Sequence, residues 1–248
     1  MKKVLIVTGG SRGIGAAIAI AAAKEGYAVC LTYLNQQAQA ETVLRSIRDS
    51  GGQAIAIQAD VASETDILRL FKQVDTRLGR VTALINNAGT LEQQCRVEAM
   101  DAARLSRVFN TNIIGSFLCC REAVLRMSTT QGGSGGAIVN ITSMAAKLGS
   151  ANEYVDYAAS KAALETLTIG LAQEVAAEGI RVNAVSPGAI YTEIHARGGE
   201  PLRVDRIKTA IPMQRGGYPE EVANAVLWLL SDNASYTTGA SIAVSGGR

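Results

Sequence analysis

The sequence has few of the residues that usually mark metal or disulfide sites. Its 248 residues include four cysteines and a single histidine. The cysteines contain no C-x-x-C pair and two of them are adjacent, which is unlike both zinc sites and disulfide frameworks. They lie at Cys30, Cys95, Cys119 and Cys120. We therefore expect reduced thiols in a cytoplasmic protein, and no metal site.

The chain also lacks an excess of either charge and any long apolar run. It has 24 Lys and Arg residues against 22 Asp and Glu residues, with no basic stripe and no like-charge run, so nothing predicts nucleic-acid binding or a charged tail. The longest small-apolar run, Ala16 to Ala23, ends at Lys24 and is much shorter than a membrane span. The run from Val4 to Val7 is too short for a signal peptide. We expect no membrane association.

Short apolar runs alternate with helical segments along the whole chain. This alternation predicts an α/β Rossmann fold, in which a doubly wound, seven-stranded parallel sheet carries helices on both faces. Residues 132–136 are glycine-rich like a linker, but the alternation continues across them, so we predict one domain over residues 1–248. The predicted strands are 4–7, 28–33, 54–58, 81–85, 137–141, 181–185 and 241–244, and the predicted helices are 14–24, 38–49, 64–78, 101–127, 158–177 and 220–230.

Residues that could bind a ligand or take part in catalysis follow the predicted strands at their carboxyl ends. Ligands bind at this edge in sheets of this kind. The segments, in strand order, are Thr8–Gly15, Asp60, Asn86–Gly89, Ser143 and Pro187-Gly188. We therefore expect a ligand site along this edge.

The segment Thr8–Gly15 joins the first predicted strand to the first predicted helix. Its glycines permit a sharp turn and a close approach to a pyrophosphate, which the helix N-terminus favours. The alternative is a plain glycine-rich turn. Gly9, Gly13 and Gly15 have the spacing G-x-x-x-G-x-G, not the general G-x-G-x-x-G. Their place in a βαβ unit favours nucleotide binding.

The end of the second predicted strand bears on the choice of nucleotide. NAD-binding chains usually carry an acidic residue there, whereas Tyr33, Leu34 and Asn35 are not acidic. Arg12, in the glycine turn, could pair with a 2′-phosphate. We predict NADP(H) as the preferred cofactor, with NAD(H) possible.

Tyr157 and Lys161 are four residues apart, on one face of a predicted helix. Tyrosine has a pKa of about 10, which a neighbouring cation lowers toward neutrality. The pair is therefore a candidate for proton transfer. The alternative is an ordinary surface helix.

Taken in order, Thr8–Gly15, Asn86–Gly89, Ser143, Tyr157 and Lys161 resemble the classical short-chain dehydrogenase/reductase family. The resemblance runs from residue 3 to residue 247 and rests on the T-G-x-x-x-G-x-G turn and the Y-x-x-x-K pair. Within the family the chain looks like bacterial glucose 1-dehydrogenases and 3-oxoacyl-carrier-protein reductases. The resemblance implies an oxidoreductase that moves a hydride between nicotinamide and a secondary alcohol or ketone.

The resemblance also implies roles for individual residues. Tyr157 would be the general acid or base, and Lys161 would lower its pKa and hold the nicotinamide ribose. Ser143 would bind the substrate oxygen, and Asn112 would hold a water in a proton relay. The cofactor-binding positions would be Gly9, Ser11, Arg12, Gly13, Ile14, Gly15, Tyr33, Asp60, Val61, Asn87, Ala88, Gly89, Lys161, Pro187, Gly188, Ile190 and Thr192.

Several of these positions have structural alternatives. Asn112 could tie off a helical kink, Asp60 could cap the following helix, and Asn86 with Asn87 could be purely structural. Thr142 competes with Ser143, because neighbouring strand residues point in opposite directions. Ser150 is an outside candidate, because the segment from Ser143 to Tyr157 is slightly longer than is usual in the family. Tyr154 has no charged residue four positions on, so it suits a pocket wall better than proton transfer.

The segment 189–216 is long and of mixed character, as is typical of a lid over a site. It contains His195, which is either a packing residue or a substrate contact. The resemblance implies a homotetramer built through the helices at 101–127 and 158–177, and a small-molecule substrate. Two other functional classes stay open: a nucleotide-binding regulatory module without catalysis, and a sugar-nucleotide epimerase or dehydratase, which would need a substrate domain.

Overall fold

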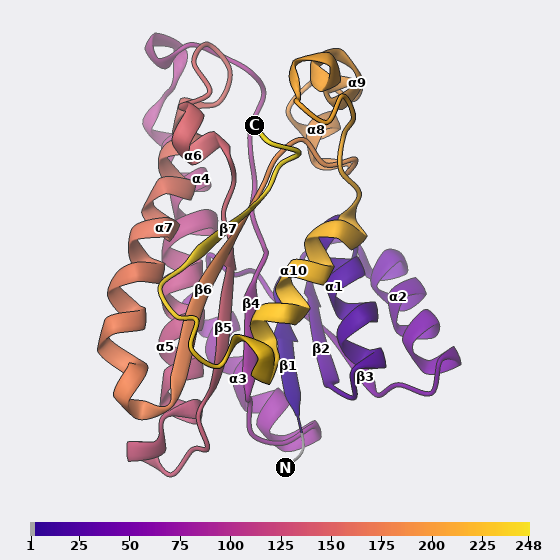
Figure 1. Ribbon diagram of the computed structural model, residues 1–248, viewed down its shortest axis with the longest axis vertical. Helices are drawn as coiled ribbons and strands as arrows, with labels where there is room; N and C mark the ends of the chain where they lie inside the picture. Colours follow the sequence, from indigo (N-terminus) through magenta and orange to yellow (C-terminus); the bar gives the residue numbers. More distant parts are fainter. Residues whose placement is uncertain (1–2) are drawn as a thin grey trace.

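The computed structural model describes residues 3–248 and contains a seven-stranded parallel sheet in the order β3-β2-β1-β4-β5-β6-β7 (Figure 1). The predicted fold class is confirmed. The strand order reverses between β1 and β4, and this is the point where such sheets bind ligands. The strands are β1 (Val4–Val7), β2 (Ala28–Tyr33), β3 (Ala54–Gln58), β4 (Ala83–Asn86), β5 (Gly136–Ile141), β6 (Ile180–Pro187) and β7 (Ser241–Val244).

Helices cover both faces of the sheet (Figure 1). One core joins the sheet to α1, α2 and α10, and the other joins it to α3, α5 and α7. The alternation along β1 explains the division, because Val4 and Ile6 enter one core whereas Leu5 and Val7 enter the other. The helices are α1 (Gly13–Lys24), α2 (Gln37–Asp49), α3 (Glu64–Arg77), α4 (Ala102–Phe109), α5 (Gly115–Met127), α6 (Ala145–Leu148), α7 (Val155–Val175), α8 (Ile194–Arg197), α9 (Arg203–Ile207) and α10 (Pro219–Leu230).

Local sequence sets several helix ends as expected. Ser63 caps α3, since its hydroxyl accepts a hydrogen bond from the backbone N–H of Asp66 at 3.3 Å. The α7 helix passes into a short 3₁₀ turn and stops at Gly179, whose φ of 77° is left-handed. The other predicted elements differ from the observed ones by a few residues at their ends, apart from the stretch 101–127.

The predicted long helical stretch over 101–127 is helical throughout 102–127, but it is not a uniform α-helix. A π-helical turn at Asn110–Ile114 separates α4 from α5. The Asn112 side chain within this turn is hydrogen-bonded to the backbone of Thr90. Gly115 then lets the chain pass close to the loop after β3, because a Cβ at that position would lie 2.5 Å from the Val61 carbonyl oxygen. Turns of this kind are frequent at functional sites.

The segment 189–216 carries α8 and α9 and lies at the end of the molecule where the chain terminates (Figure 1). Its base is joined by a bridge between Ile190 and Gly217, next to the carboxyl end of β6. Val204 and Ile211 are buried there in a small apolar cluster with Ala189. Within residues 3–248, no helix is both long and apolar enough to cross a bilayer.

Candidate active site

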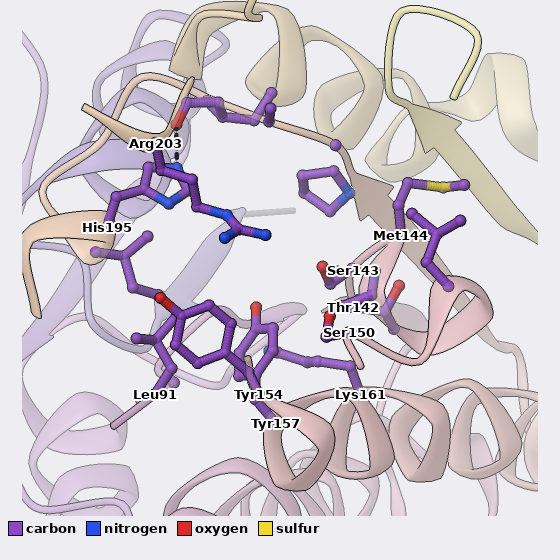
Figure 2. A pocket seen from close by; sticks show the side chains of 18 of the residues that line it. Leu91, Thr142, Ser143, Met144, Ser150, Tyr154, Tyr157, Lys161, His195 and Arg203 are labelled. Atoms are coloured by element: carbon purple, nitrogen blue, oxygen red, sulfur yellow. Dashed lines mark hydrogen bonds between the residues drawn. The ribbon is translucent and has the colours of Figure 1, made fainter. Parts of the chain in front are cut away.

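A cavity of about 420 Å³ lies at the carboxyl edge of the sheet. The end of β5, the first turns of α7, the start of the segment 189–216 and the glycine turn all contribute to its lining. Figure 2 shows Tyr157, Lys161 and Ser143 on one wall, with His195 and Arg203 reaching in from the opposite wall. The predicted catalytic residues therefore meet in one space, except Asn112, which lies behind the wall.

Tyr157 and Lys161 lie side by side on α7, with the Lys161 ammonium 5.6 Å from the centre of the Tyr157 ring. The Lys161 Nζ donates a hydrogen bond to the Ile141 carbonyl oxygen at 2.8 Å. Burial lowers the pKa of Lys161 to about 8. Burial also raises the pKa of Tyr157 to about 12, while a hydrogen bond with Ser143 opposes this rise. Among the chain's own residues, desolvation of the phenol thus outweighs its neighbours, whereas the predicted lowering also relies on the positive charge of a cofactor.

The hydroxyls of Thr142 and Ser143, the two neighbouring candidates for binding the substrate oxygen, lie in different surroundings. The Thr142 hydroxyl is buried against β6, where it donates to the Val185 carbonyl oxygen at 3.1 Å and lies 2.8 Å from the Ser186 hydroxyl. The Ser143 hydroxyl accepts the backbone N–H of Ala145 and faces Tyr157. Ser150 also lines the cavity, in a left-handed conformation at φ 50°. Of the three, only Ser143 acts on the pKa of the Tyr157 hydroxyl.

Asn112 is fully buried, and its side chain holds neighbouring segments together. Its Oδ1 accepts the backbone N–H of Thr90 at 2.8 Å, and its Nδ2 donates to the Thr90 carbonyl at 2.9 Å and to the Ser160 hydroxyl at 2.9 Å. A Cβ on Gly89 would lie 3.5 Å from Asn112 Oδ1 and 3.4 Å from Lys161 Nζ. These bonds agree with the alternative that Asn112 stabilises a helical kink. The residue also lies close to Lys161.

The glycine turn is fastened to the segment after β4. Asn87 Nδ2 donates to the carbonyl oxygens of Thr8 at 2.9 Å and Gly9 at 3.0 Å, and the Thr8 hydroxyl accepts the N–H groups of Asn87 and Ala88, both at 3.0 Å. Gly9 and Gly13 have positive φ angles of 62° and 53°, which L side chains rarely adopt.

The first turn of α1 offers an uncommitted anion site. It contains no acidic residue, and its N-cap, Arg12, makes no side-chain capping bond. A side chain at Gly13 would meet Thr192 of the segment 189–216, because a Cβ there would lie 3.3 Å from Thr192 Cγ2. This cradle fits the pyrophosphate of a dinucleotide, since backbone N–H groups at a helix N-terminus bind phosphate without counter-charge from the chain.

The other predicted cofactor positions are distributed along the same edge. The cavity itself is lined by Ile14, Asn87, Gly89, Lys161, Pro187, Gly188, Ile190 and Thr192. Asp60 Oδ1 accepts the N–H of Ala62 at 2.9 Å in the loop before α3, so the capping alternative for Asp60 is wrong, because the cap of α3 is Ser63. The positions outside the cavity lining are Gly9, Ser11, Arg12, Gly13, Gly15, Tyr33, Asp60, Val61 and Ala88.

Sequence reasoning did not single out the charged residues on the far wall. Arg203 Nη2 pairs with Glu153 Oε2 at 2.5 Å, and its guanidinium lies 5.3 Å from the centre of the Tyr154 ring. Tyr154 donates its hydroxyl proton to the Gly198 carbonyl oxygen at 3.1 Å. No sequence spacing links Glu153 with Arg203, so only the fold brings them together. They join the segment 189–216 to the loop before α7.

His195 lines the cavity, and its tautomer follows from its partner. Its Nε2 lies 2.9 Å from the Ile190 carbonyl oxygen, which can only accept, so Nε2 carries the proton and Nδ1 carries a lone pair. Burial lowers the pKa of His195 and so favours this neutral form. Among residues 3–248, no group of three or more His, Cys, Asp or Glu residues is placed to hold a metal ion.

Comparisons with known proteins identify similar oxidoreductases. A family model described as enoyl-(acyl carrier protein) reductase matches residues 9–248. An uncharacterized oxidoreductase of Escherichia coli is 56% identical over 99% of both chains, and a 3-oxoacyl-(acyl-carrier-protein) reductase of Staphylococcus epidermidis is 37% identical over 100% of this chain and 99% of its own.

Two solved structures share the fold at full length. A dehydrogenase/reductase from Sinorhizobium meliloti has a TM-score of 0.91 and 35% identity, covering 99% of this chain and 94% of its own. A mutant of a short-chain dehydrogenase/reductase from Serratia marcescens has a TM-score of 0.88 and 34% identity, covering 99% and 97%.

Proposed function

The chain belongs to the short-chain dehydrogenase/reductase family and is an oxidoreductase acting on CH–OH or keto groups, and on that premise we propose that it is an NADP(H)-dependent reductase or dehydrogenase of a small secondary alcohol or ketone. The observation that carries the proposal is the meeting of Tyr157, Lys161 and Ser143 on one cavity wall, beside a glycine turn that can hold a dinucleotide.

The chain's own residues account for proton transfer and substrate placement. When bound, the nicotinamide supplies or accepts the hydride. In the reductive direction, Ser143 donates a hydrogen bond to the carbonyl oxygen, and Tyr157 gives its phenolic proton to that oxygen as the carbonyl carbon gains the hydride. The Lys161 ammonium stabilises the resulting phenolate. In the oxidative direction the phenolate takes the proton from the alcohol.

The preference for NADP(H) rests on the end of β2 and on Arg12. Tyr33, Leu34 and Asn35 provide no carboxylate for a ribose 2′-hydroxyl. The Arg12 side chain makes no hydrogen bond or ion pair with other residues of the described chain, so its forked guanidinium is available for a 2′-phosphate. Residues such as Asp60 and Val61 would then contact the adenine, and Ile190 and Thr192 the nicotinamide side.

The substrate class is a small polar carbonyl compound. The cavity presents the His195 Nδ1 lone pair and the Arg203–Glu153 pair opposite Tyr157, so it can accept and donate hydrogen bonds at its far wall. Apolar side chains such as Leu91 and Ile207 complete the lining. A sugar, a hydroxylated ketone or a 3-oxoacyl group fits this combination, and residues 189–216 form a lid over it.

We also propose a cytoplasmic homotetramer formed by one domain, residues 1–248. Free cysteines, including the buried Cys30, Cys119 and Cys120, favour a reducing compartment. Large apolar side chains are exposed on the two helices that the family resemblance points to, notably Phe117 on α5 at 49% and Ile169 on α7 at 50%. Exposed apolar surface of this kind commonly marks an interface.

A panel of substrates tests the proposal. Sugars, secondary alcohols, ketones and 3-oxoacyl thioesters are assayed with NADPH and NADP⁺ by absorbance in both directions, with wild type and Tyr157→Phe. We expect turnover on at least one class, with a loss of 10³-fold or so in Tyr157→Phe and unchanged NADPH binding. Full NADPH binding with no turnover on any class would favour the regulatory-module alternative instead.

A further inference from the structure

A buried ion pair stands one residue before Tyr157 and has no part in the chemistry described so far. Arg104 of α4 meets Asp156 of α7, with Nε–Oδ2 at 2.7 Å and Nη2–Oδ1 at 3.3 Å. The two side chains are 10% and 1% exposed. No other ion pair within residues 3–248 has both side chains this buried.

This pair joins three segments of the chain. The Arg104 Nη1 donates to the carbonyl oxygen of Gln93, in the loop that follows β4, at 2.7 Å. Asp156 Oδ1 accepts the backbone N–H of Tyr157 at 2.9 Å. That N–H belongs to the first turn of α7, where no carbonyl of the helix can reach it, and the N-cap Tyr154 provides no side-chain bond. Asp156 therefore fixes the backbone of Tyr157 from its amino side.

A second set of contacts fixes Tyr157 from its carboxyl side. The Ser160 hydroxyl donates to the Tyr157 carbonyl oxygen at 2.7 Å and accepts from Asn112 Nδ2 at 2.9 Å. Asn112 is in turn bonded to Thr90. Both backbone groups of Tyr157 are thus held by side chains whose partners lie on the α4–π-turn segment or on the loop after β4.

We propose that Arg104 and Asp156 are positioning residues for Tyr157, which set where its hydroxyl stands relative to the cavity. The inference rests on the proposed role of Tyr157 as proton donor. A buried ion pair is weak evidence for stability, because apolar side chains of similar volume often fill its place equally well. Geometry is the more demanding requirement, since a displacement of about 1 Å can cost on the order of 100-fold in rate.

The test separates geometry from stability with the double variant Arg104→Met/Asp156→Leu. It removes both charges together, so no buried charge is left unpaired. We expect a melting temperature within a few degrees of wild type, a kcat lower by roughly 10- to 100-fold, and a KM for NADPH within about twofold, because the glycine turn is untouched. A wild-type kcat in this folded variant would overturn the proposal.

Two further variants guard this interpretation. Arg104→Lys keeps the charge but lacks the fork that spans Asp156 and Gln93, and we expect it to lower kcat while leaving the KM for NADPH unchanged, even if the double variant does not fold. Arg126→Met is the matched control. Arg126 pairs with Asp75 and Glu122 on α3 and α5, and its side chain is 18% exposed. It should lose thermal stability and keep kcat; a parallel loss of kcat would assign the effect to stability and overturn the proposal.

The same measurements distinguish this proposal from the proposed function. Turnover that survives Tyr157→Phe would refute the role of Tyr157 itself, whatever the ion pair does. An inactive Tyr157→Phe together with wild-type kinetics in Arg104→Met/Asp156→Leu would refute the positioning role alone. Fluorescence titration with NADPH gives a binding readout that neither substitution should change.

Discussion

Lys161 is held by the end of the neighbouring strand, because its Nζ donates to the carbonyl oxygen of Ile141 at 2.8 Å. Ile141 is the last residue of β5, so the strand that leads to Ser143 also fixes the lysine beside Tyr157. The contact satisfies one ammonium proton in a buried site, and Lys161 also lines the cavity. The two proposed roles of Lys161, binding the cofactor and lowering the pKa of Tyr157, both depend on this position.

Lys161 should make the stability of the protein depend on pH. Burial lowers its pKa from 10.5 to about 8. Between these values the unfolded chain binds more protons than the folded one, so the free energy of unfolding rises with pH across this window. Below pH 8 the buried charge therefore costs about 3 kcal/mol at 1.36 kcal/mol per pKa unit.

Lys161→Met should therefore have a higher free energy of unfolding than wild type below pH 8, with the difference fading by pH 10.5. Urea melts of both proteins from pH 6 to 10.5 measure it. The raised pKa of Tyr157 lowers stability only above pH 10, so it does not affect the comparison over most of this window. A difference that does not change with pH would contradict the prediction.

Ser143→Ala and Thr142→Ala should separate a catalytic hydroxyl from a structural one. Ser143 faces Tyr157, whereas the Thr142 hydroxyl is committed to Val185 and Ser186. We expect Ser143→Ala to lower kcat/KM by about 100-fold with little change in melting temperature. Thr142→Ala should instead cost about 1–3 kcal/mol of stability, by leaving buried polar partners unpaired, with kcat nearly unchanged. The reverse pattern would exchange their roles.

The variant Arg12→Leu tests whether Arg12 is responsible for a preference for NADPH over NADH. If the guanidinium pairs with a 2′-phosphate, its loss removes charged hydrogen bonds worth about 1.5–3 kcal/mol. The kcat/KM for NADPH should then fall by roughly 10- to 100-fold, while that for NADH changes little. Arg45→Leu, at an exposed arginine of α2, is the control. Equal losses with both cofactors would refute the 2′-phosphate contact.

His195 should act as a hydrogen-bond acceptor toward the substrate through Nδ1. His195→Leu removes this acceptor, so KM should rise by about 10-fold for a substrate with a hydroxyl beside the carbonyl and stay unchanged for its deoxy analogue. His195→Asn, whose side-chain oxygen accepts hydrogen bonds, should recover part of the loss. An equal rise in KM for both substrates would indicate that His195 only packs the wall.

Charges on the exposed faces of α5 and α7 should dissociate the proposed tetramer. Phe117→Glu with Ile169→Glu places carboxylates where large apolar side chains are now 49% and 50% exposed. We expect light scattering at micromolar concentration to show a smaller assembly than wild type. Leu68→Glu, at a leucine of α3 that is 45% exposed, should leave the mass unchanged. If the wild-type protein has the mass of a single chain, the proposed tetramer is wrong.

The order of elements and the edge that carries the site could be predicted because both are local properties. Apolar runs such as Val4–Val7 identify buried strands wherever they occur, and the Gly9-to-Gly15 spacing identifies a phosphate turn from local sequence. The Tyr157–Lys161 pair follows from helical spacing alone. These features can therefore be predicted without knowing which segments pack against them.

Tertiary contacts decided the rest, because their partners are far apart in the chain. The π turn at Asn112 depends on Thr90, and the far wall depends on Arg203 meeting Glu153 across 50 residues. The pKa of Tyr157 rises because the fold desolvates it, an effect that helical spacing cannot reveal. Sequence pattern thus determined which residues could do chemistry and at which edge, whereas packing determined how they are held, what charge they carry and what faces them.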